Sequence, residues 1–200
     1  MKRTKVENTL AAIGLRAKTG RAIAVLLAAP VTGPRVLRRL ELKLHDASLP
    51  DTAQPYHTVM HLPWAEAEIA VQPLINAIET VAAKSLKDFI SQLEDVLVCG
   101  IGVVGSLDRN LEKLGNYHIR AHAAEGILFR RVLETAAKTN HLPCKTIAEK
   151  EVFEAAARAL RRPVAEVRRL IGEARRADLQ PWRADEKAAM AAAWLALASY

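Results

Sequence analysis

Two hundred residues, half of them apolar, suffice for one domain with a hydrophobic core. The chain carries a formal net charge of +7, and its charged residues make up 26%. No apolar run approaches the ~18 residues of a membrane span, so we expect no membrane partner. Cys99 and Cys144 lie far apart in apolar surroundings, which predicts reduced, buried thiols in a cytoplasmic protein.

The first predicted elements are three antiparallel strands. A strand over residues 9–17 leads into a turn in which Gly20 supplies a positive φ. Residues 22–28 are apolar on both faces, as is typical of a central strand. Apolar and polar residues nearly alternate over residues 35–44, which indicates a strand with one face exposed to solvent. The polar residues 46–63 predict a crossover loop, in which Tyr56, His57 and His61 lie.

Helices and strands alternate in the rest of the chain. Residues 64–93 have a helical period, and Pro73 is expected to kink or divide that helix. The continuous apolar run at 96–104 predicts a parallel strand covered on both faces. The later segments predict a helix to about residue 138, a strand at 143–148, and helices at 151–160, 164–176 and 183–198.

This order of elements predicts a single α/β domain over residues 1–200. Three antiparallel strands followed by right-handed crossovers give a mixed five-stranded sheet, continued by parallel strands and covered by helices on both faces. We expect an Arg-rich helical insertion at about 150–178, before the last helix.

Two short motifs support a family resemblance. Ile13-Gly14-Leu15-Arg16 is followed by Thr19-Gly20-Arg21-Ala22, and Asp185 with Glu186 opens an Ala-rich last helix. The order of elements resembles the ribonuclease H-like superfamily, and the motifs look like those of Holliday-junction resolvases of the RuvC type. In those nucleases the first strand reads apolar-Gly-apolar-Asp, and a carboxylate at the start of the last helix completes the metal site.

The resemblance implies an incomplete acidic site. Arg16 stands where these nucleases carry their first metal-binding Asp, and Val104-Gly105 stands where they carry a Glu. Two-metal phosphodiester cleavage needs several carboxylates around ions that lie ~4 Å apart. We therefore expect nuclease activity to be lost or altered, and a centre built from Arg16, Glu125 and Asp185.

His118, His122 and Glu125 form one stripe on a predicted helix, because they are spaced by four and then three residues. One interpretation is a divalent-metal site for Mg²⁺, Mn²⁺ or Zn²⁺, with Asp185 as a further ligand. The other is a structural network, in which Glu125 pairs with Arg16 or Arg120 and His118 lies near the helix cap.

The arginines of the predicted helices between 151 and 176 indicate attraction to a polyanion, although a solvated basic face would explain them as well. The residues expected to contact phosphates are Arg168, Arg169, Arg175 and Arg176, together with Arg16 on the first strand. The favoured function is binding of nucleic acid, or of a partner in a nucleic-acid pathway. The alternatives are a single-metal hydrolase that acts on a small substrate, and a homodimeric scaffold whose Ala-rich last helix packs against a second subunit.

Overall fold

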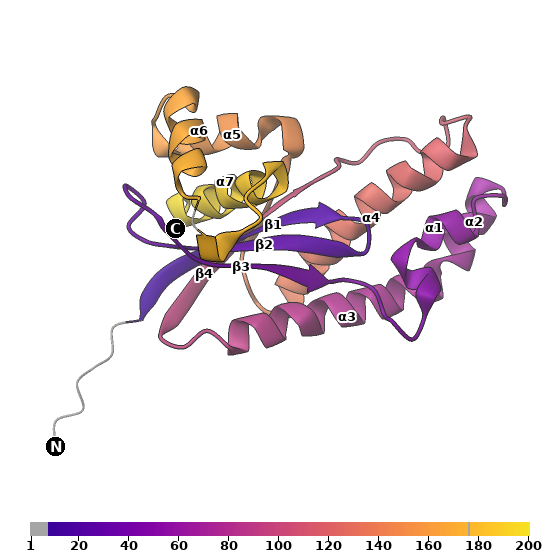
Figure 1. Cartoon of the computed structure of the whole chain (residues 1–200). Coiled ribbons are helices and arrows are strands. Elements are labelled where there is room, and N and C mark those ends of the chain that lie inside the picture. The colour runs from indigo at the N-terminus through magenta and orange to yellow at the C-terminus, as the bar shows by residue number, and fades with distance from the viewer. Residues whose placement is uncertain (1–7, 176) are drawn as a thin grey trace, which may run out of the picture.

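The computed structural model describes residues 8–175 and 177–200 and contains a five-stranded mixed sheet (Figure 1). Its strands are β1 (Thr9–Lys18), β2 (Arg21–Ala28), β3 (Arg35–Lys43), β4 (Val96–Gly105) and β5 (Cys144–Ala148), in the order β3-β2-β1-β4-β5. β2 pairs antiparallel with both β1 and β3, whereas β4 pairs parallel with both β1 and β5. This is the sheet of a ribonuclease H-like fold, so the predicted fold class is confirmed.

The helices follow the predicted order, with local differences. They are α1 (Pro55–Thr58), α2 (Trp64–Ala70), α3 (Gln72–Ser91), α4 (Tyr117–Thr139), α5 (Val152–Leu160), α6 (Val164–Glu173) and α7 (Ala184–Ala198), with short 3₁₀ turns at Pro50–Ala53, Glu149–Glu151 and Ala177–Leu179. The expected crossover loop is partly helical, because Pro50 and Pro55 open helical turns, where proline is favoured. The helix divides at Val71, just before Pro73. None of the helices in the described ranges is both long and apolar enough to span a bilayer.

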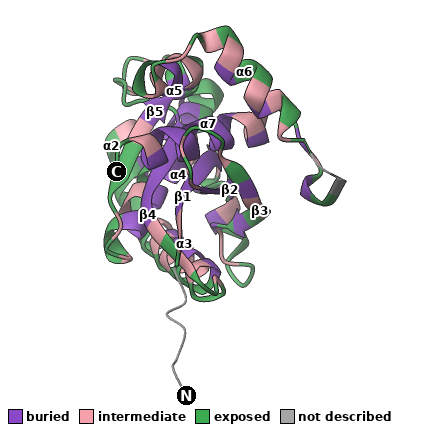
Figure 2. Ribbon diagram, turned by 90° about the vertical axis from the view of Figure 1, so that its left-hand side faces the viewer, coloured by how far each residue is buried: buried purple, intermediate pink, exposed green. Residues whose placement is uncertain are grey.

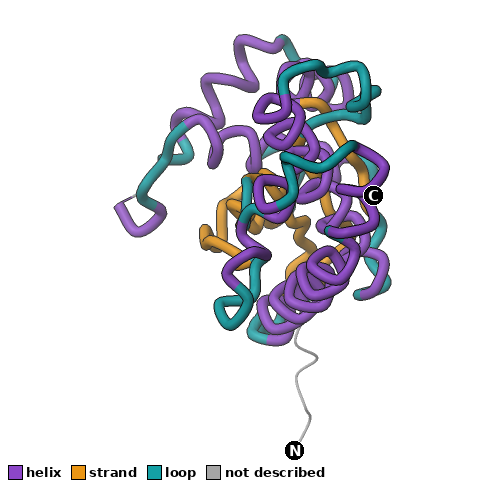
Figure 3. Tube along the Cα trace, turned by 90° about the vertical axis from the view of Figure 1, so that its right-hand side faces the viewer, coloured by secondary structure: helices purple, strands orange, loops and turns teal. Residues whose placement is uncertain are grey.

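Helices lie on both sides of the strands (Figure 3), and the buried residues, purple in Figure 2, divide into two separate cores. Side chains such as Ile13 and Phe129 form one core with α3 and α4. Trp194 and the rest of α7 form the other core, over which α5 and α6 lie. The middle of α7, from Ala188 to Leu197, is buried against the sheet and α5 of the same chain. The expected packing of this helix against a second subunit stays a prediction.

Two glycines allow α7 to lie against the backbone of the central strands. A Cβ atom on Gly14 would lie 1.7 Å from the carbonyl oxygen of Ala189, and one on Gly102 would lie 2.3 Å from that of Ala192. Both distances are far below van der Waals contact. The small residues on both elements therefore set the separation of helix and sheet.

Helix α4 extends well past the sheet (Figure 1). Arg130 marks the level of the last β4 residue, because a Cβ atom on Gly105 would lie 2.7 Å from the Arg130 Cγ. Tyr117, the first residue of α4, lies 13 residues before Arg130, so with a rise of 1.5 Å per residue the helix begins roughly 20 Å beyond that level. The overhanging turns contact α1, and the Asn116 side chain caps them by accepting a hydrogen bond of 2.9 Å from the Ile119 amide. The cap is therefore Asn116 and not His118.

The cysteine prediction is half correct. Both thiols are free, and Cys99 is buried in β4. Cys144 is exposed, because it begins the edge strand β5. The compartment stays a prediction.

Candidate functional site

Arg16 lies at the carboxyl end of β1 and points toward the start of α7. Its guanidinium donates a 2.5 Å hydrogen bond to Glu149 Oε2, and its Nε lies 3.4 Å from Asp185 Oδ1. The side chain is only 10% exposed, so this cation is held among carboxylates and away from open solvent. Arg16 and Asp185, which the sequence analysis expects in one centre, are therefore neighbours, and Glu149 is a partner that the sequence analysis missed.

Two further cations neutralise the same acidic cluster. Lys18 Nζ lies 3.2 Å from Asp185 Oδ2. Arg39 on β3 donates hydrogen bonds of 2.5 and 3.2 Å to Glu186 Oε1. Glu186 also accepts a 2.9 Å hydrogen bond from the Arg183 amide, which closes a capping box at the start of α7. We name the three cations, Arg16, Lys18 and Arg39, and the three carboxylates, Glu149, Asp185 and Glu186, the rim network.

The pKa of Glu186 reflects this neutralisation. Burial alone would raise the pKa, but the hydrogen bonds from Arg39, the Arg183 amide and its own amide outweigh that effect and lower it. In the rim network three positive groups face three negative groups, so its formal charge is zero. The β4 residue in register with Arg16 is the apolar Val104. The geometry is that of an ion-pair network.

Glu125 does not belong to this centre. It is fully buried on α4, which packs on the opposite face of the sheet from α7. Its Oε1 lies 2.8 Å from His57 Nδ1 and accepts a 3.3 Å hydrogen bond from the His57 amide. The expected pairing of Glu125 with Arg16 or Arg120 is therefore wrong. The Arg120 guanidinium instead lies 5.5 Å from the Trp64 ring centroid.

Three histidines gather at the overhanging end of α4. His118 and His122 lie one turn apart on α4, and His57 approaches from α1. Their ring centroids lie 4.4 to 5.1 Å apart. Within the described ranges, this is the one group of His, Cys, Asp or Glu side chains whose ligand atoms all lie within 4.8 Å of one another. The third member of the cluster is thus His57 and not the predicted Asp185. Glu125 is not a member but contacts the His57 ring.

The arginines expected to contact phosphates have glutamate neighbours. Arg168 pairs with Glu154 at 3.1 Å, and Arg169 pairs with Glu173 at 2.7 Å. Arg175 is exposed just beyond the end of α6, and Arg176 lies outside the described residues. The carboxylates therefore moderate the positive charge of α5 and α6.

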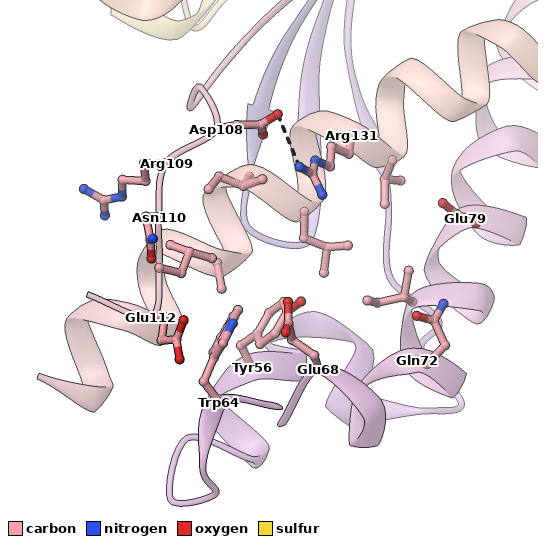
Figure 4. A pocket seen from close by; sticks show the side chains of 16 residues that line it. Tyr56, Trp64, Glu68, Gln72, Glu79, Asp108, Arg109, Asn110, Glu112 and Arg131 are labelled. Atoms are coloured by element: carbon pink, nitrogen blue, oxygen red, sulfur yellow. Dashed lines mark ion pairs between the residues drawn. The ribbon is translucent and has the colours of Figure 1, made fainter. Parts of the chain in front are cut away.

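A cleft of about 420 Å³ lies beside α4 (Figure 4). The stacked rings of Tyr56 and Trp64, 5.5 Å apart, form part of its wall, and Asp108 pairs with Arg131 at 3.2 Å. Ile127, another lining residue, lies nine residues after His118 and so points to the other side of the helix. None of the site residues predicted from the sequence lines this cleft.

Comparisons with known proteins bear on the fold. No known family profile matches the chain, and no curated protein matches it. Among solved structures it is similar to Thermus thermophilus RuvC, with 14% identity over 92% of each chain and a TM-score of 0.48. It is also similar to T. thermophilus RuvC in complex with Holliday junction substrate, with 16% identity over 93% of this chain and 91% of that chain and a TM-score of 0.46.

Proposed function

We propose that this protein binds nucleic acid and that its rim network no longer supports two-metal cleavage. The carrying observation is the Arg16 guanidinium, buried between Glu149 and Asp185 at the carboxyl end of β1. Ligands of open α/β sheets bind outside the carboxyl ends of the strands. Arg16 therefore lies where a reaction centre would be expected.

The charge of Arg16 decides against a divalent ion at this place. A guanidinium stays protonated at every pH relevant to proteins. A divalent ion 4 Å from it would be repelled by about 8 kcal/mol at an effective dielectric constant of 20. The carboxylates that would offset this repulsion are already paired with Arg16, Lys18 and Arg39.

Binding of nucleic acid is supported by the charge of the chain and by the exposed arginines near α7. The net charge of +7 favours a polyanionic partner. The ion pairs of Arg168 and Arg169 are more than 40% exposed, and such surface pairs contribute at most about 1 kcal/mol. Phosphates can therefore replace the glutamates as partners of these two arginines. Arg175, just beyond the end of α6, is also exposed.

The test is fluorescence anisotropy with labelled duplex, single-stranded and four-way-junction DNA over a series of salt concentrations. If Arg168, Arg169 and Arg175 each neutralise one phosphate, they contribute about −2.7 to the slope of log affinity against log salt. The triple alanine variant should lose that part, which corresponds to about 40-fold between roughly 50 and 200 mM salt.

A matched control is the triple alanine variant of Lys84, Lys87 and Lys138, exposed lysines on α3 and α4. It should bind like the unmodified protein. Absence of binding at 50 mM salt, or equal slopes for both triple variants, contradicts the binding proposal. Cleavage of these DNAs in the presence of Mg²⁺ or Mn²⁺ would contradict the proposed loss of two-metal chemistry. The cleavage would also have to be retained in His122→Ala, because this substitution removes the separate histidine cluster as its source.

A further inference from the structure

We infer that His57, His118 and His122 form a site for a single transition-metal ion, Zn²⁺ in preference, with an open fourth position that takes water or an anionic oxygen. This site lies on the opposite face of the sheet from the rim network, and the inference does not depend on nucleic-acid binding.

The three rings are close to ligand geometry. Zinc–nitrogen bonds of 2.0–2.1 Å in a tetrahedron place donor atoms about 3.3 Å apart. The candidate donor atoms lie within 4.8 Å of one another. His118 and His122 are exposed, so small side-chain rotations can bring their nitrogens inward without repacking the core.

Glu125 fixes the orientation of the third ring. A hydrogen bond from His57 Nδ1 to Glu125 Oε1, at 2.8 Å, leaves the Nε2 lone pair of His57 for a metal. Metal-ligating histidines usually donate their other ring N–H to a carboxylate or carbonyl in this way. The arrangement accounts for the placement of a carboxylate directly behind His57.

The burial of Glu125 is a second, independent indication of a cation. The residue is 0% exposed, and its Oε2 has no hydrogen-bond partner among the described residues. A buried carboxylate is costly without compensating charge. The Arg120 guanidinium is not directed at this carboxylate but stacks over the rings of Trp64 and Tyr117. A divalent ion bound through His57 would supply the positive charge.

The donor set selects the kind of metal. Three imidazoles suit Zn²⁺ and other late transition metals, whereas Mg²⁺ and Mn²⁺ prefer carboxylates, carbonyls and water. The exposure of His118 and His122 leaves one side open to solvent. Three protein ligands with an open position are typical of catalytic zinc sites, in contrast to the four ligands of structural ones.

The experiment uses the full chain without a polyhistidine tag, treated with chelator and then titrated with ZnCl₂ in competition with a chromogenic chelator. We expect one Zn²⁺ per chain, no competition from millimolar Mg²⁺, and the intense visible absorption of four-coordinate Co²⁺ when CoCl₂ is used. Zinc at a hundredfold excess over its Kd should raise the Tm by about 5 to 10 °C.

Three variants test the ligand set. His122→Ala should abolish stoichiometric binding, and His118→Ala should do the same; both residues are exposed, and unchanged circular dichroism confirms that the variants fold. Glu125→Gln should weaken binding by about 10- to 100-fold. His61→Ala, an exposed histidine outside the cluster, is the matched control and should bind as tightly as the unmodified protein. Failure to bind zinc stoichiometrically, or equal affinities for His122→Ala and His61→Ala, overturns the inference and leaves the nucleic-acid proposal intact.

Discussion

Replacement of Arg39 by methionine should destabilise the protein strongly at neutral pH. Methionine keeps an unbranched apolar side chain but removes the cation that faces Glu186, whose side chain is only 3% exposed. The two residues come from distant parts of the chain, one from β3 and the other from the first turn of α7. Their pairing therefore couples the edge of the sheet to the buried last helix.

The expected loss follows from the burial of Glu186. Removal of one partner of a buried ion pair costs about 3 to 5 kcal/mol. Glu186 retains the Arg183 amide and a favourable position at a helix N-terminus, so we expect a value near the lower limit, about 3 kcal/mol. For a chain of this length the Tm should fall by roughly 6 to 12 °C.

The loss should depend on pH in a defined direction. Because the folded-state pKa of Glu186 is lowered, the pair contributes stability above the unfolded-state value near 4.5 and loses it as the pH falls through the folded-state pKa. Without Arg39, the charged form of Glu186 loses the Arg39 hydrogen bonds and positive charge, so the Glu186 pKa should be higher than in the unmodified protein and protonation should offset part of the loss of stability. The difference between the two proteins should shrink from pH 7 to pH 4.

Urea unfolding at both pH values measures these differences. Arg21→Met is the matched control, because Arg21 and Glu41 form a pair at 3.4 Å in the same sheet with both side chains about half exposed. Its cost should stay below about 1 kcal/mol. Equal costs for Arg39→Met and Arg21→Met, or a cost for Arg39→Met that is the same at pH 4 and pH 7, would refute the reasoning.

Further substitutions test the packing of α7 and the role of Arg16. Gly14→Ala should cost at least about 3 kcal/mol, because its Cβ would overlap the Ala189 carbonyl oxygen, whereas Gly33→Ala, with open space around it, should change stability by less than about 0.5 kcal/mol. Equal urea midpoints for the two variants would show that α7 can move away from the sheet. Arg16→Asp should create a cation-dependent protein, in which Mn²⁺ raises the Tm although it has no such effect on the unmodified chain. An unchanged Tm of Arg16→Asp on addition of Mn²⁺ would show that the Arg16 guanidinium does not occupy the position of a metal ion.

The order of strands and helices was predictable, since strand and helix periods are local properties of the sequence. The apolar runs of β2 and β4 and the alternation of β3 each identify a strand by its burial. Element ends were predicted less well. The helical turns between residues 46 and 63 lack a periodic apolar stripe, and proline favours both loops and helix starts.

The site was predictable only where topology fixes both partners. Arg16 lies near the end of β1 and Asp185 lies in the first turn of α7, and the fold brings these two ends together. Glu125 and Asp185 were wrongly placed in one centre, because the sequence alone does not determine that α4 and α7 cover opposite faces. His57 was missed as a partner of His118 and His122, since its position depends on the docking of α1 against α4, a long-range contact.

The close approach of α7 to Gly14 and Gly102 gives its monotonous composition a meaning. In a saturation mutagenesis library selected for folded protein, the buried alanines Ala188, Ala189, Ala191, Ala192 and Ala193 should tolerate almost no larger side chain, although helix propensity alone would accept larger helix formers such as leucine. The intolerance should extend to Gly14 and Gly102, and an enlarged residue on the helix should not be rescued by further trimming of strands that already lack side chains there. The alanines of α7 therefore reflect the short distance between the backbone of this helix and the backbones of β1 and β4.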